Sequence, residues 1–402
     1  DRGLMVSHWA DRTLPTHAPQ NRKFQGVRAG ASWEHAIELA NLTDKDLWVC
    51  VPDLATDDYV RQLAALLRDT LEPDRQVYVE WSNETWNMTF AQAGRNLNAA
   101  VSEVNAGGSN LNFDGSTSQA TWAWRRVGRR IVQISGIFRS VCGDTAMMTR
   151  VRPVLAMQSA SPITVRLPIE YIERFFGPPC RSLYGIGEAP YFNLSREDSA
   201  RTDLTVDRIF SLLPASLARC RANMLVWTSL AKYYRLRHLA YEGGPDIVGS
   251  ASLAAKIAAN RDERMGTLIE QHLRSFYELG GDQFEFFTGT GAYSQFSMTG
   301  ITEDVAVRDT FKISALARVL AGGRPSVTAG CLVPGTESAT NSVLRDSCAF
   351  VGSDPAGGSF LGSNRAGCWA NYLIRVPAAG DFRITVRVGS AVATSRLDVL
   401  VD

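Results

Sequence analysis

The 402-residue sequence lacks the features on which several large classes of protein depend. Its 42 Lys and Arg nearly balance its 41 Asp and Glu, so the net charge of +1 gives no bulk attraction to nucleic acid or to an anionic membrane. No apolar run approaches the ~20 residues that a membrane-spanning helix needs. We therefore expect neither a nucleic acid nor a membrane as a partner.

Histidine is scarce, and several short motifs are missing. The five His form no HExxH pattern and no CxxC pair exists, which argues against a zinc site and makes a metal-dependent hydrolase the weakest interpretation of this chain. No GxGxxG or GxxxxGKS/T turn follows a strand candidate, so nucleotide binding has little support. We expect no metal and no cofactor.

The seven cysteines fall into two groups. Four are spread over the first 325 residues, mostly in apolar surroundings, as expected of small buried side chains. The other three, Cys331, Cys348 and Cys368, are close together in a loop-rich region where one disulfide can form. A disulfide fits an exported protein, so we expect a secreted or periplasmic location. No signal peptide is visible, but the sequence does not begin with Met.

From the N-terminus to about residue 323, apolar strand-like runs alternate with amphipathic helical stretches. This alternation predicts an α/β fold with parallel strands. The strand candidates are residues 4–7, 47–51, 76–81, 153–157, 183–187, 237–241 and 283–287, and the clearest helices follow Thr56 and cover 124–138, 265–276 and 307–320. Seven strands are one short of a (β/α)8 TIM barrel. An open doubly wound sheet is the alternative, but we prefer a barrel whose first strand lies upstream of Asp1.

After residue 324 the helical periodicity stops. Apolar and polar residues alternate in 371–376, 382–388 and 397–401, with a Pro–Gly turn at 377–380, which is typical of an antiparallel β-sandwich. A sandwich usually needs ~100 residues, and fewer than 80 are present. We therefore expect two domains, 1–323 and 324–402, the second partial, and a chain that is a fragment of a longer secreted protein.

The strand candidate at 76–81 is followed by a polar segment. The odd positions Val77, Val79 and Trp81 are apolar and suit the helix layer, whereas the even positions Tyr78, Glu80, Ser82 and Glu84 would face the barrel axis. Glu84 then lies at the C-terminal end of a strand and points inward, where barrel enzymes carry catalytic residues. A plain alternative is that Ser82 and Asn83 cap the following helix.

A second glutamate ends another strand. Ala240 and Glu242 share a strand face, and the small Ala240 leaves room below the carboxylate. Gly243 and Gly244 allow a sharp turn and a close approach to a ligand, although Glu242–Gly244 is also compatible with an ordinary turn. With one strand missing in front, the two glutamates follow the fourth and seventh strands of eight.

Two carboxyl groups at the mouth of one barrel suit glycoside hydrolysis, because one must protonate the leaving oxygen while the other attacks the sugar carbon. The competing hypothesis is a non-catalytic carbohydrate-binding protein on a decayed barrel. The presence of both Glu84 and Glu242 favours the enzyme.

The segments VEWSNETWN and AYEGG resemble the acid/base and nucleophile strands of clan A (β/α)8 glycoside hydrolases. With WVCVPDLATDDYVRQLAALL and APYF, residues 4–322 resemble a group of bacterial secreted barrel proteins. The resemblance implies polysaccharide degradation with retention, Glu84 as acid/base and Glu242 as nucleophile. It also implies that Asn83 binds the sugar 2-hydroxyl and that Tyr191 hydrogen-bonds the nucleophile. The tail NYLIRVPAAGDFRITVRVGS resembles the start of a family 6 or 35 carbohydrate-binding module.

Further residues near strand ends complete the predicted site. Trp86 and Trp9 are candidate stacking platforms for a sugar ring. Asp53, Glu188 and His8 would contact sugar hydroxyls or hold a catalytic residue. Tyr293 would take the place of the tryptophan that many clan members carry after the last strand. We expect Glu80 to form a buried ion pair and His238 to be structural.

Overall fold

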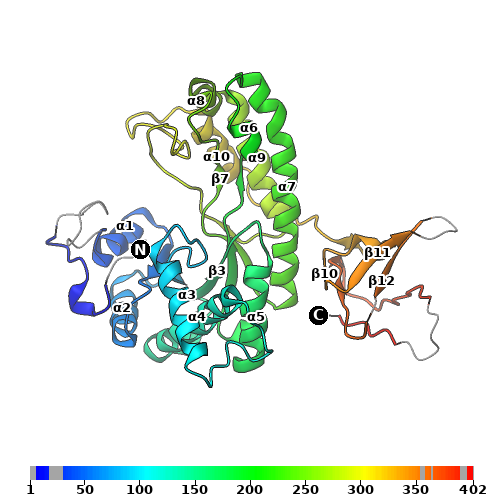
Figure 1. Ribbon diagram of the computed structural model, residues 1–402. Helices are drawn as coiled ribbons and strands as arrows, with labels where there is room; N and C mark the ends of the chain where they lie inside the picture. The colour runs from blue at the N-terminus through cyan, green and yellow to red at the C-terminus, as the bar shows by residue number, and fades with distance from the viewer. Residues whose placement is uncertain (1–5, 18–29, 354–357, 364, 390–395, 402) are drawn as a thin grey trace.

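The computed structural model describes residues 6–17, 30–353, 358–363, 365–389 and 396–401 (Figure 1). Its main element is a curled sheet of six parallel strands in the order β1-β2-β3-β4-β6-β8. The strands are β1 (Leu47–Val51), β2 (Val77–Trp81), β3 (Val151–Ala156), β4 (Gly185–Glu188), β6 (Arg237–Ala240) and β8 (Gln283–Phe284). The predicted α/β class and parallel pairing are confirmed.

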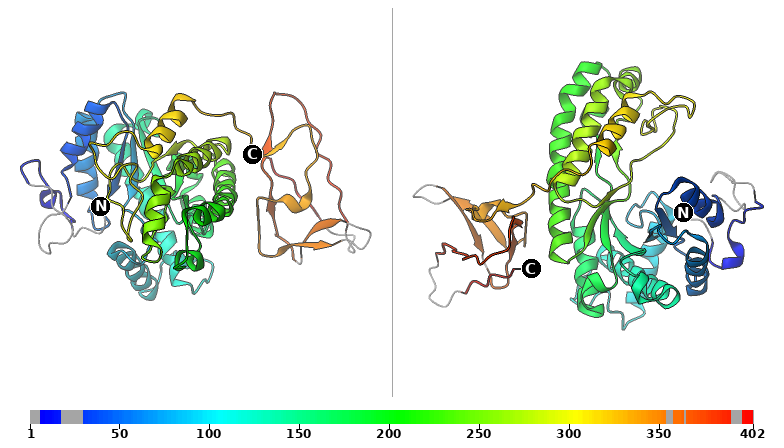
Figure 2. Two further views of the ribbon diagram at one scale, coloured as in Figure 1. Left: turned by 90° about the horizontal axis from the view of Figure 1, so that it is seen from above. Right: turned by 180° about the vertical axis from the view of Figure 1, so that it is seen from behind.

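Helices connect these strands and cover one face of the sheet (Figure 2). Their bounds are α1 (Trp33–Thr43), α2 (Asp57–Thr70), α3 (Ala91–Asn105), α4 (Gln119–Cys142), α5 (Ile163–Phe176), α6 (Arg196–Ser199), α7 (Val206–Tyr233), α8 (Leu253–Arg261), α9 (Glu263–Glu278) and α10 (Phe311–Ala321). Thr56 caps α2 as predicted, because its hydroxyl accepts a hydrogen bond from the Tyr59 amide at 3.2 Å. In the described part of the chain, no helix has the length and hydropathy to cross a bilayer.

The sheet differs from a closed eight-stranded barrel. Of the strand predicted at 4–7, residues 4 and 5 lie outside the described residues, and Val6 and Ser7 belong to no strand. Instead, the Ser7 carbonyl accepts a hydrogen bond from the Thr56 amide at 3.0 Å. Within the described residues the six strands therefore form an open, half-barrel sheet with β1 and β8 at its edges.

The two faces of the sheet carry different side chains. On β2, Val77, Val79 and Trp81 pack with residues of α2, α4 and α5 in the larger apolar core. Tyr78 instead joins Val154 and Leu239 in a small cluster on the concave face. This confirms the predicted alternation along β2 and fixes which face looks into the half-barrel.

The region after residue 324 is made of short paired strands beside α7 (Figure 2). They are β9 (Cys331–Leu332), β10 (Leu344–Arg345), β11 (Ala349–Ser353), β12 (Ser359–Ser363), β13 (Ala370–Asn371) and β14 (Ile374–Arg375). They pair only two by two. Cys348 and Cys368 form a disulfide, as expected for this cysteine group.

The strands predicted at 382–388 and 397–401 are not formed. Their alternating apolar side chains are exposed, from 45% at Phe382 to 69% at Val388. Alternation supplies an apolar face, but a strand is stable only when that face and its backbone groups find partners. No described segment packs on this face, so the sequence pattern alone did not produce a sandwich.

Candidate active site

The turn after β2 holds Glu84 in an unusual backbone conformation. The Ser82 amide still donates to the Val51 carbonyl at 2.8 Å, but Ser82 and Glu84 both have positive φ angles, 56° and 50°. Non-glycine residues adopt this region at a cost, and such residues cluster at functional sites. Helix α3 begins only at Ala91, with Phe90 as its N-cap, so the alternative in which Ser82 and Asn83 cap a helix is wrong.

Neighbouring amides hold the Glu84 turn together. The Asn87 side-chain amide donates to Glu84 Oε2 at 2.9 Å, and the Asn87 backbone amide donates to the Glu84 carbonyl at 2.9 Å. The Gln92 side chain donates to the Asn83 carbonyl at 2.7 Å. Glu84 is 8% exposed. Its carboxylate is thus fixed by a neutral donor three residues along the chain.

The turn after β6 is built by long-range contacts. The Tyr241 amide donates to the Glu188 carbonyl at 3.0 Å, which extends the β4–β6 pairing by one residue. Beyond Glu242, strands β5 (Tyr191–Phe192) and β7 (Gly244–Pro245) pair in parallel, with Tyr191 opposite Gly244. The loops after β4 and β6 are therefore joined directly beside Glu242.

Gly243 and Gly244 are required by this packing. A Cβ on Gly243 would lie 2.6 Å from the Phe284 ring, and one on Gly244 would lie 3.0 Å from Phe286. Gly244 also has a φ of 133°. The predicted sharp turn is confirmed, and what approaches these glycines closely is the pair of aromatic rings at and after β8.

The expected shared face of Ala240 and Glu242 is wrong. Ala240 packs in the second apolar cluster with Phe276 and Leu273 of α9, on the helix side of the sheet. Leu239 faces the concave side, so alternation alone would turn Glu242 outward. The chain bends after Ala240, however, and the charge of Glu242 raises the pKa of both Glu80 and Cys50 on the concave face. Glu242 therefore reaches the interior through the bend.

The charges of both glutamates act on two tyrosines, Tyr191 and Tyr241. Burial and then the charge of Glu242 raise the pKa of Tyr191, whose hydroxyl donates to the Glu242 carboxylate; the charge of Glu84 adds a smaller effect. Burial raises the pKa of Tyr241, followed by the charges of Glu84, Glu242 and Glu80 in that order. Both carboxylates therefore lie near enough to these two hydroxyls to affect their ionisation.

Glu80 lies below this pair and is 3% exposed. Its carboxylate accepts hydrogen bonds from the Trp48 indole at 3.0 Å and the Cys50 thiol at 3.5 Å. Burial is the main cause that raises its pKa to about 7. The buried ion pair expected for Glu80 is replaced, among the described residues, by these neutral donors, which suit a carboxyl group that is partly protonated near neutral pH.

Two other predicted acids are occupied by protein partners. Asp53 forms a two-pronged ion pair with Arg95, at 2.6 and 2.7 Å. Glu188 is fully buried, and its two oxygens contact His238 Nε2 at 2.8 Å and the Ser159 hydroxyl. Glu188 shares a strand face with Ile186, which packs in the main core, so it points toward the helices. Contact of Glu188 with a sugar hydroxyl therefore has no structural support, whereas the structural role expected of His238 is confirmed.

Three further predicted residues, Trp9, His8 and Trp86, have different surroundings. Trp9 packs edge-on against Tyr59 at 5.2 Å, and the Arg12 guanidinium lies 4.2 Å from the Trp9 ring centre. His8 is exposed and directly precedes a short 3-10 helix, Trp9–Asp11. Trp86 is half-buried against the main core, and burial raises the pKa of Tyr241, on which Trp86 has a smaller, opposite effect. Of the three, only Trp86 is thus linked to the two glutamates.

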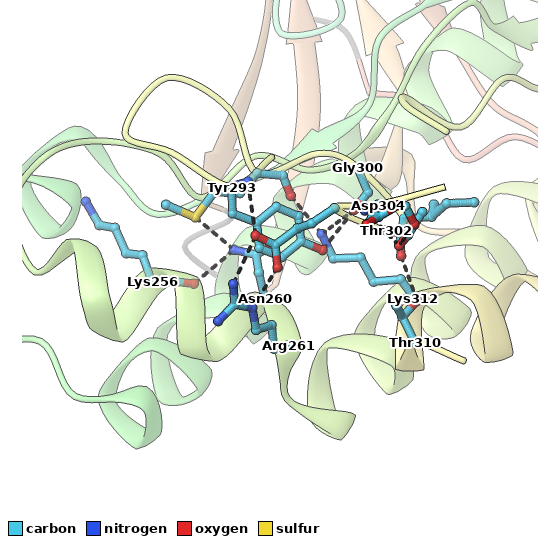
Figure 3. A network of polar contacts seen from close by, with 12 residues as sticks. Lys256, Asn260, Arg261, Tyr293, Gly300, Thr302, Asp304, Thr310 and Lys312 are labelled. Carbon is cyan, nitrogen blue, oxygen red and sulfur yellow. Dashed lines mark hydrogen bonds and ion pairs between the residues drawn. The ribbon is translucent and has the colours of Figure 1, made fainter. Parts of the chain in front are cut away.

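Tyr293 belongs to a polar network between β8 and α10 (Figure 3). Its hydroxyl donates to the Gly300 carbonyl at 2.9 Å, and the Lys312 ammonium lies 4.6 Å from its ring centre. Lys312 also donates to the Met298 carbonyl at 2.7 Å. The Tyr293 hydroxyl and one ring face are thus used to fix this loop, and the structure gives no support to its use as a sugar platform.

Sequence reasoning missed Tyr241 and Asp246. The charge of Asp246 also raises the pKa of Tyr191, and burial raises the pKa of Asp246 itself. The signal for Tyr241 was its place directly before Glu242, two residues after the inward-facing Leu239. Asp246 had no local signal, because the β5–β7 pairing brings it to Tyr191. Among the described residues, no group of three or more His, Cys, Asp and Glu is arranged to hold a metal ion.

No family model matches the chain, and no curated protein matches it. Solved structures similar to it include a fungal β-1,4-galactanase, with a TM-score of 0.35, 10% identity and coverage of 72% of this chain and 92% of that one. Xylanase B from Clostridium stercorarium F9 has a TM-score of 0.27 and 10% identity, with coverage of 59% of this chain and 56% of that one. The endo-β-1,4-mannanase from Thermotoga petrophila has a TM-score of 0.31 and 11% identity, with coverage of 70% of this chain and 71% of that one. We draw no conclusion about function from similarities this weak.

Proposed function

We propose that this chain is a retaining glycoside hydrolase that acts on a polysaccharide or oligosaccharide, with Glu84 as acid/base and Glu242 as nucleophile. The observation that carries the proposal is that both carboxylates act on the hydroxyls of Tyr191 and Tyr241. The reaction needs two carboxyl groups, and here each of the two glutamates follows a parallel strand of the α/β half-barrel.

The two glutamates have environments suited to different roles. Glu242 accepts the Tyr191 hydroxyl, which favours its ionised form, and an ionised carboxylate is what a nucleophile needs. Glu84 is buried, and its carboxylate accepts a hydrogen bond from the neutral side-chain amide of Asn87. A carboxyl group held by a neutral donor is compatible with the role of general acid.

The reaction then proceeds in two steps. Glu84 gives its proton to the glycosidic oxygen while the Glu242 carboxylate attacks the anomeric carbon, so the leaving group departs as an alcohol and a glycosyl ester forms on Glu242. Glu84, now ionised, takes a proton from water, whose oxygen attacks the anomeric carbon and releases Glu242. Asn83, which precedes Glu84 in this turn, is assigned to the sugar 2-hydroxyl.

The division into domains 1–323 and 324–402 and a secreted or periplasmic location are part of the same proposal. The disulfide between Cys348 and Cys368 supports the location, because such bonds persist in oxidising compartments.

Glutamine substitutions test the assignment directly. Glu84→Gln and Glu242→Gln should each lower hydrolysis by ~10³-fold or more on whichever substrate of a polysaccharide panel the wild type cleaves, with nearly unchanged thermal melting. Glu38→Gln, on the exposed side of α1, is the matched control and should keep full activity. Full activity of either site variant would remove the assignment. Binding of a polysaccharide without any hydrolysis by the wild type would favour the non-catalytic alternative.

A further inference from the structure

The chain that leaves β8 runs directly beside the turn of Glu242. The Glu285 amide donates to the Ala240 carbonyl at 2.9 Å, and the Phe287 amide donates to the Gly243 carbonyl at 3.0 Å. The two accepting carbonyls lie on either side of Glu242 in the sequence. This short segment after β8 therefore holds the bend that turns the Glu242 side chain into the half-barrel.

A second part of the loop between β8 and α10 lies beside this segment. The Thr288 amide donates to the Thr299 carbonyl at 3.2 Å, and the Ile301 amide donates back to the Thr288 carbonyl at 2.9 Å. Both bonds meet at Thr288, which directly follows Phe287. The second part of the loop therefore fixes the first part by a pair of backbone bonds.

The start of α10 holds this second part in turn (Figure 3). The Lys312 ammonium donates to the Met298 carbonyl at 2.7 Å and to the Gly300 carbonyl at 3.2 Å. The Thr310 hydroxyl, at the N-cap of α10, donates to the Ile301 carbonyl at 2.6 Å. A series of hydrogen bonds, joined by short pieces of backbone, thus runs from the start of α10 through the loop to the turn after β6.

Lys312 is a costly residue at this place. Its side chain is 1% exposed, and burial lowers its pKa to about 7, against the opposite effect of the Glu303 charge. Glu303 is itself paired with Arg261 at 2.7 Å. A methionine of similar length would fill the same space without burying a charge. What the ammonium provides is its bonds to the two loop carbonyls, with the Tyr293 ring centre at 4.6 Å.

We propose that Lys312 is a positioning residue for Glu242: it fixes the loop between β8 and α10, and that loop holds the Glu242 turn through the Gly243 carbonyl. The catalytic meaning of this role rests on the proposed function, which assigns Glu242 as the nucleophile. A nucleophile that is less well placed slows the chemical step more than it weakens substrate binding. Loss of the ammonium should therefore lower kcat while KM changes little.

The first test reads the loop without any substrate. Lys312→Met removes the donors and keeps an unbranched apolar side chain, and native-state amide hydrogen exchange is followed by NMR. The amides of Phe287, Thr288 and Ile301 should exchange ~10-fold faster or more than in the wild type, because the carbonyls that hold the loop lose a charged donor. Amides of β1 and β2 should keep their protection. Unchanged exchange of Phe287 and Thr288 in folded Lys312→Met overturns the proposal.

Lys256→Met is the matched control. Lys256 is also fully buried, and its ammonium donates to the Ser199 carbonyl at 2.7 Å and the Val248 carbonyl at 2.9 Å. The same chemistry is lost in Lys256→Met, but outside the series of bonds that leads to Gly243, so Phe287 and Thr288 should exchange as in the wild type. Equal acceleration in both variants overturns the specific role of Lys312.

A neutral donor gives a second variant if Lys312→Met does not fold. The amide of glutamine forms weaker bonds to carbonyls than an ammonium does, so Lys312→Gln should speed exchange of Phe287 and Thr288 by less than Lys312→Met. Unchanged exchange in Lys312→Gln overturns the proposal equally.

Activity on the same proteins separates this proposal from the proposed function. If the wild type hydrolyses a glycoside, kcat should fall ~10-fold or more in folded Lys312→Met, with KM within ~3-fold and with kcat nearly kept in Lys256→Met. A wild-type kcat in folded Lys312→Met overturns the positioning role. If the wild type hydrolyses nothing while the exchange changes as expected, the proposed function fails and the link from Lys312 to the Glu242 turn stands.

Discussion

The turns that carry Glu84 and Glu242 reach the same place by different means. The Glu84 turn is local: its bonds come from Asn87 and Gln92, within nine residues, and it contains two left-handed residues. The Glu242 turn depends on distant segments, because β5 pairs with β7 and aromatic rings at and after β8 press on Gly243 and Gly244. One half of the candidate site is thus set by local backbone strain and the other by tertiary packing.

The largest expected effect on stability concerns Glu80, beneath both turns. Its pKa is about 7 in the folded chain against an ordinary 4.5. The folded state thus holds a proton that the unfolded state has already released between those values, so the free energy of unfolding falls as pH rises from about 4.5 to 7. The loss should be about 3 kcal/mol and should be absent in Glu80→Gln.

Urea unfolding at a series of pH values measures this effect. His272 acts in the opposite direction, because burial lowers its pKa to about 4, so stability is lost as pH falls from 6.5 toward 4. The difference between Glu80→Gln and wild type cancels the His272 contribution. A flat difference across pH 4.5–7 would contradict the assignment.

Gly243→Ala should break the packed turn. The added Cβ meets the Phe284 ring at 2.6 Å, and overpacking of this kind costs about 1–3 kcal/mol. Because the same turn positions Glu242, activity should fall together with stability, as measured by chemical denaturation and kcat/KM. Gly94→Ala, where a Cβ meets nothing within 4 Å, is the control; equal effects of the two changes would remove the argument.

The smallest effect is expected in the strained turn. Ser82 has a φ of 56°, and its buried hydroxyl has no partner among the described residues. Ser82→Gly should relieve the left-handed strain and stabilise the chain by up to about 1 kcal/mol. Clear destabilisation of Ser82→Gly in the same denaturation assay would contradict the prediction, because it would show that the Ser82 side chain makes a stabilising contact in this turn.

This contrast also explains what the sequence could predict. Strand β1 and the alternation along β2 were readable, because a single strand with one apolar face carries its own signal. Glu84 was found for the same reason. The orientation of Glu242 was not readable, since its inward position depends on a bend made with β5 and β8.

The local sequence carries a signal for the orientations of Glu188 and Tyr241, but none for the partner of Asp53 or for the missing strands after residue 380. Ile186 on the same strand face as Glu188 indicates that this acid points toward the helices, and the inward-facing Leu239 indicates that Tyr241, directly after β6, also faces inward. The ion pair of Asp53 with Arg95, 42 residues away, has no such signal. The exposed alternating residues after 380 show that a strand pattern without packing partners does not form a strand.

The most direct test of the account is covalent trapping at Glu242. A 2-deoxy-2-fluoroglycoside with a good leaving group, matched to the sugar that the wild type cleaves, should leave one fluorosugar on the enzyme, because loss of the 2-hydroxyl slows the second step. Peptide mass spectrometry should then find the added mass on Glu242 and none in Glu242→Gln. Turnover of the reagent with the sugar on another residue, or with no covalent species at all, would contradict the central claim.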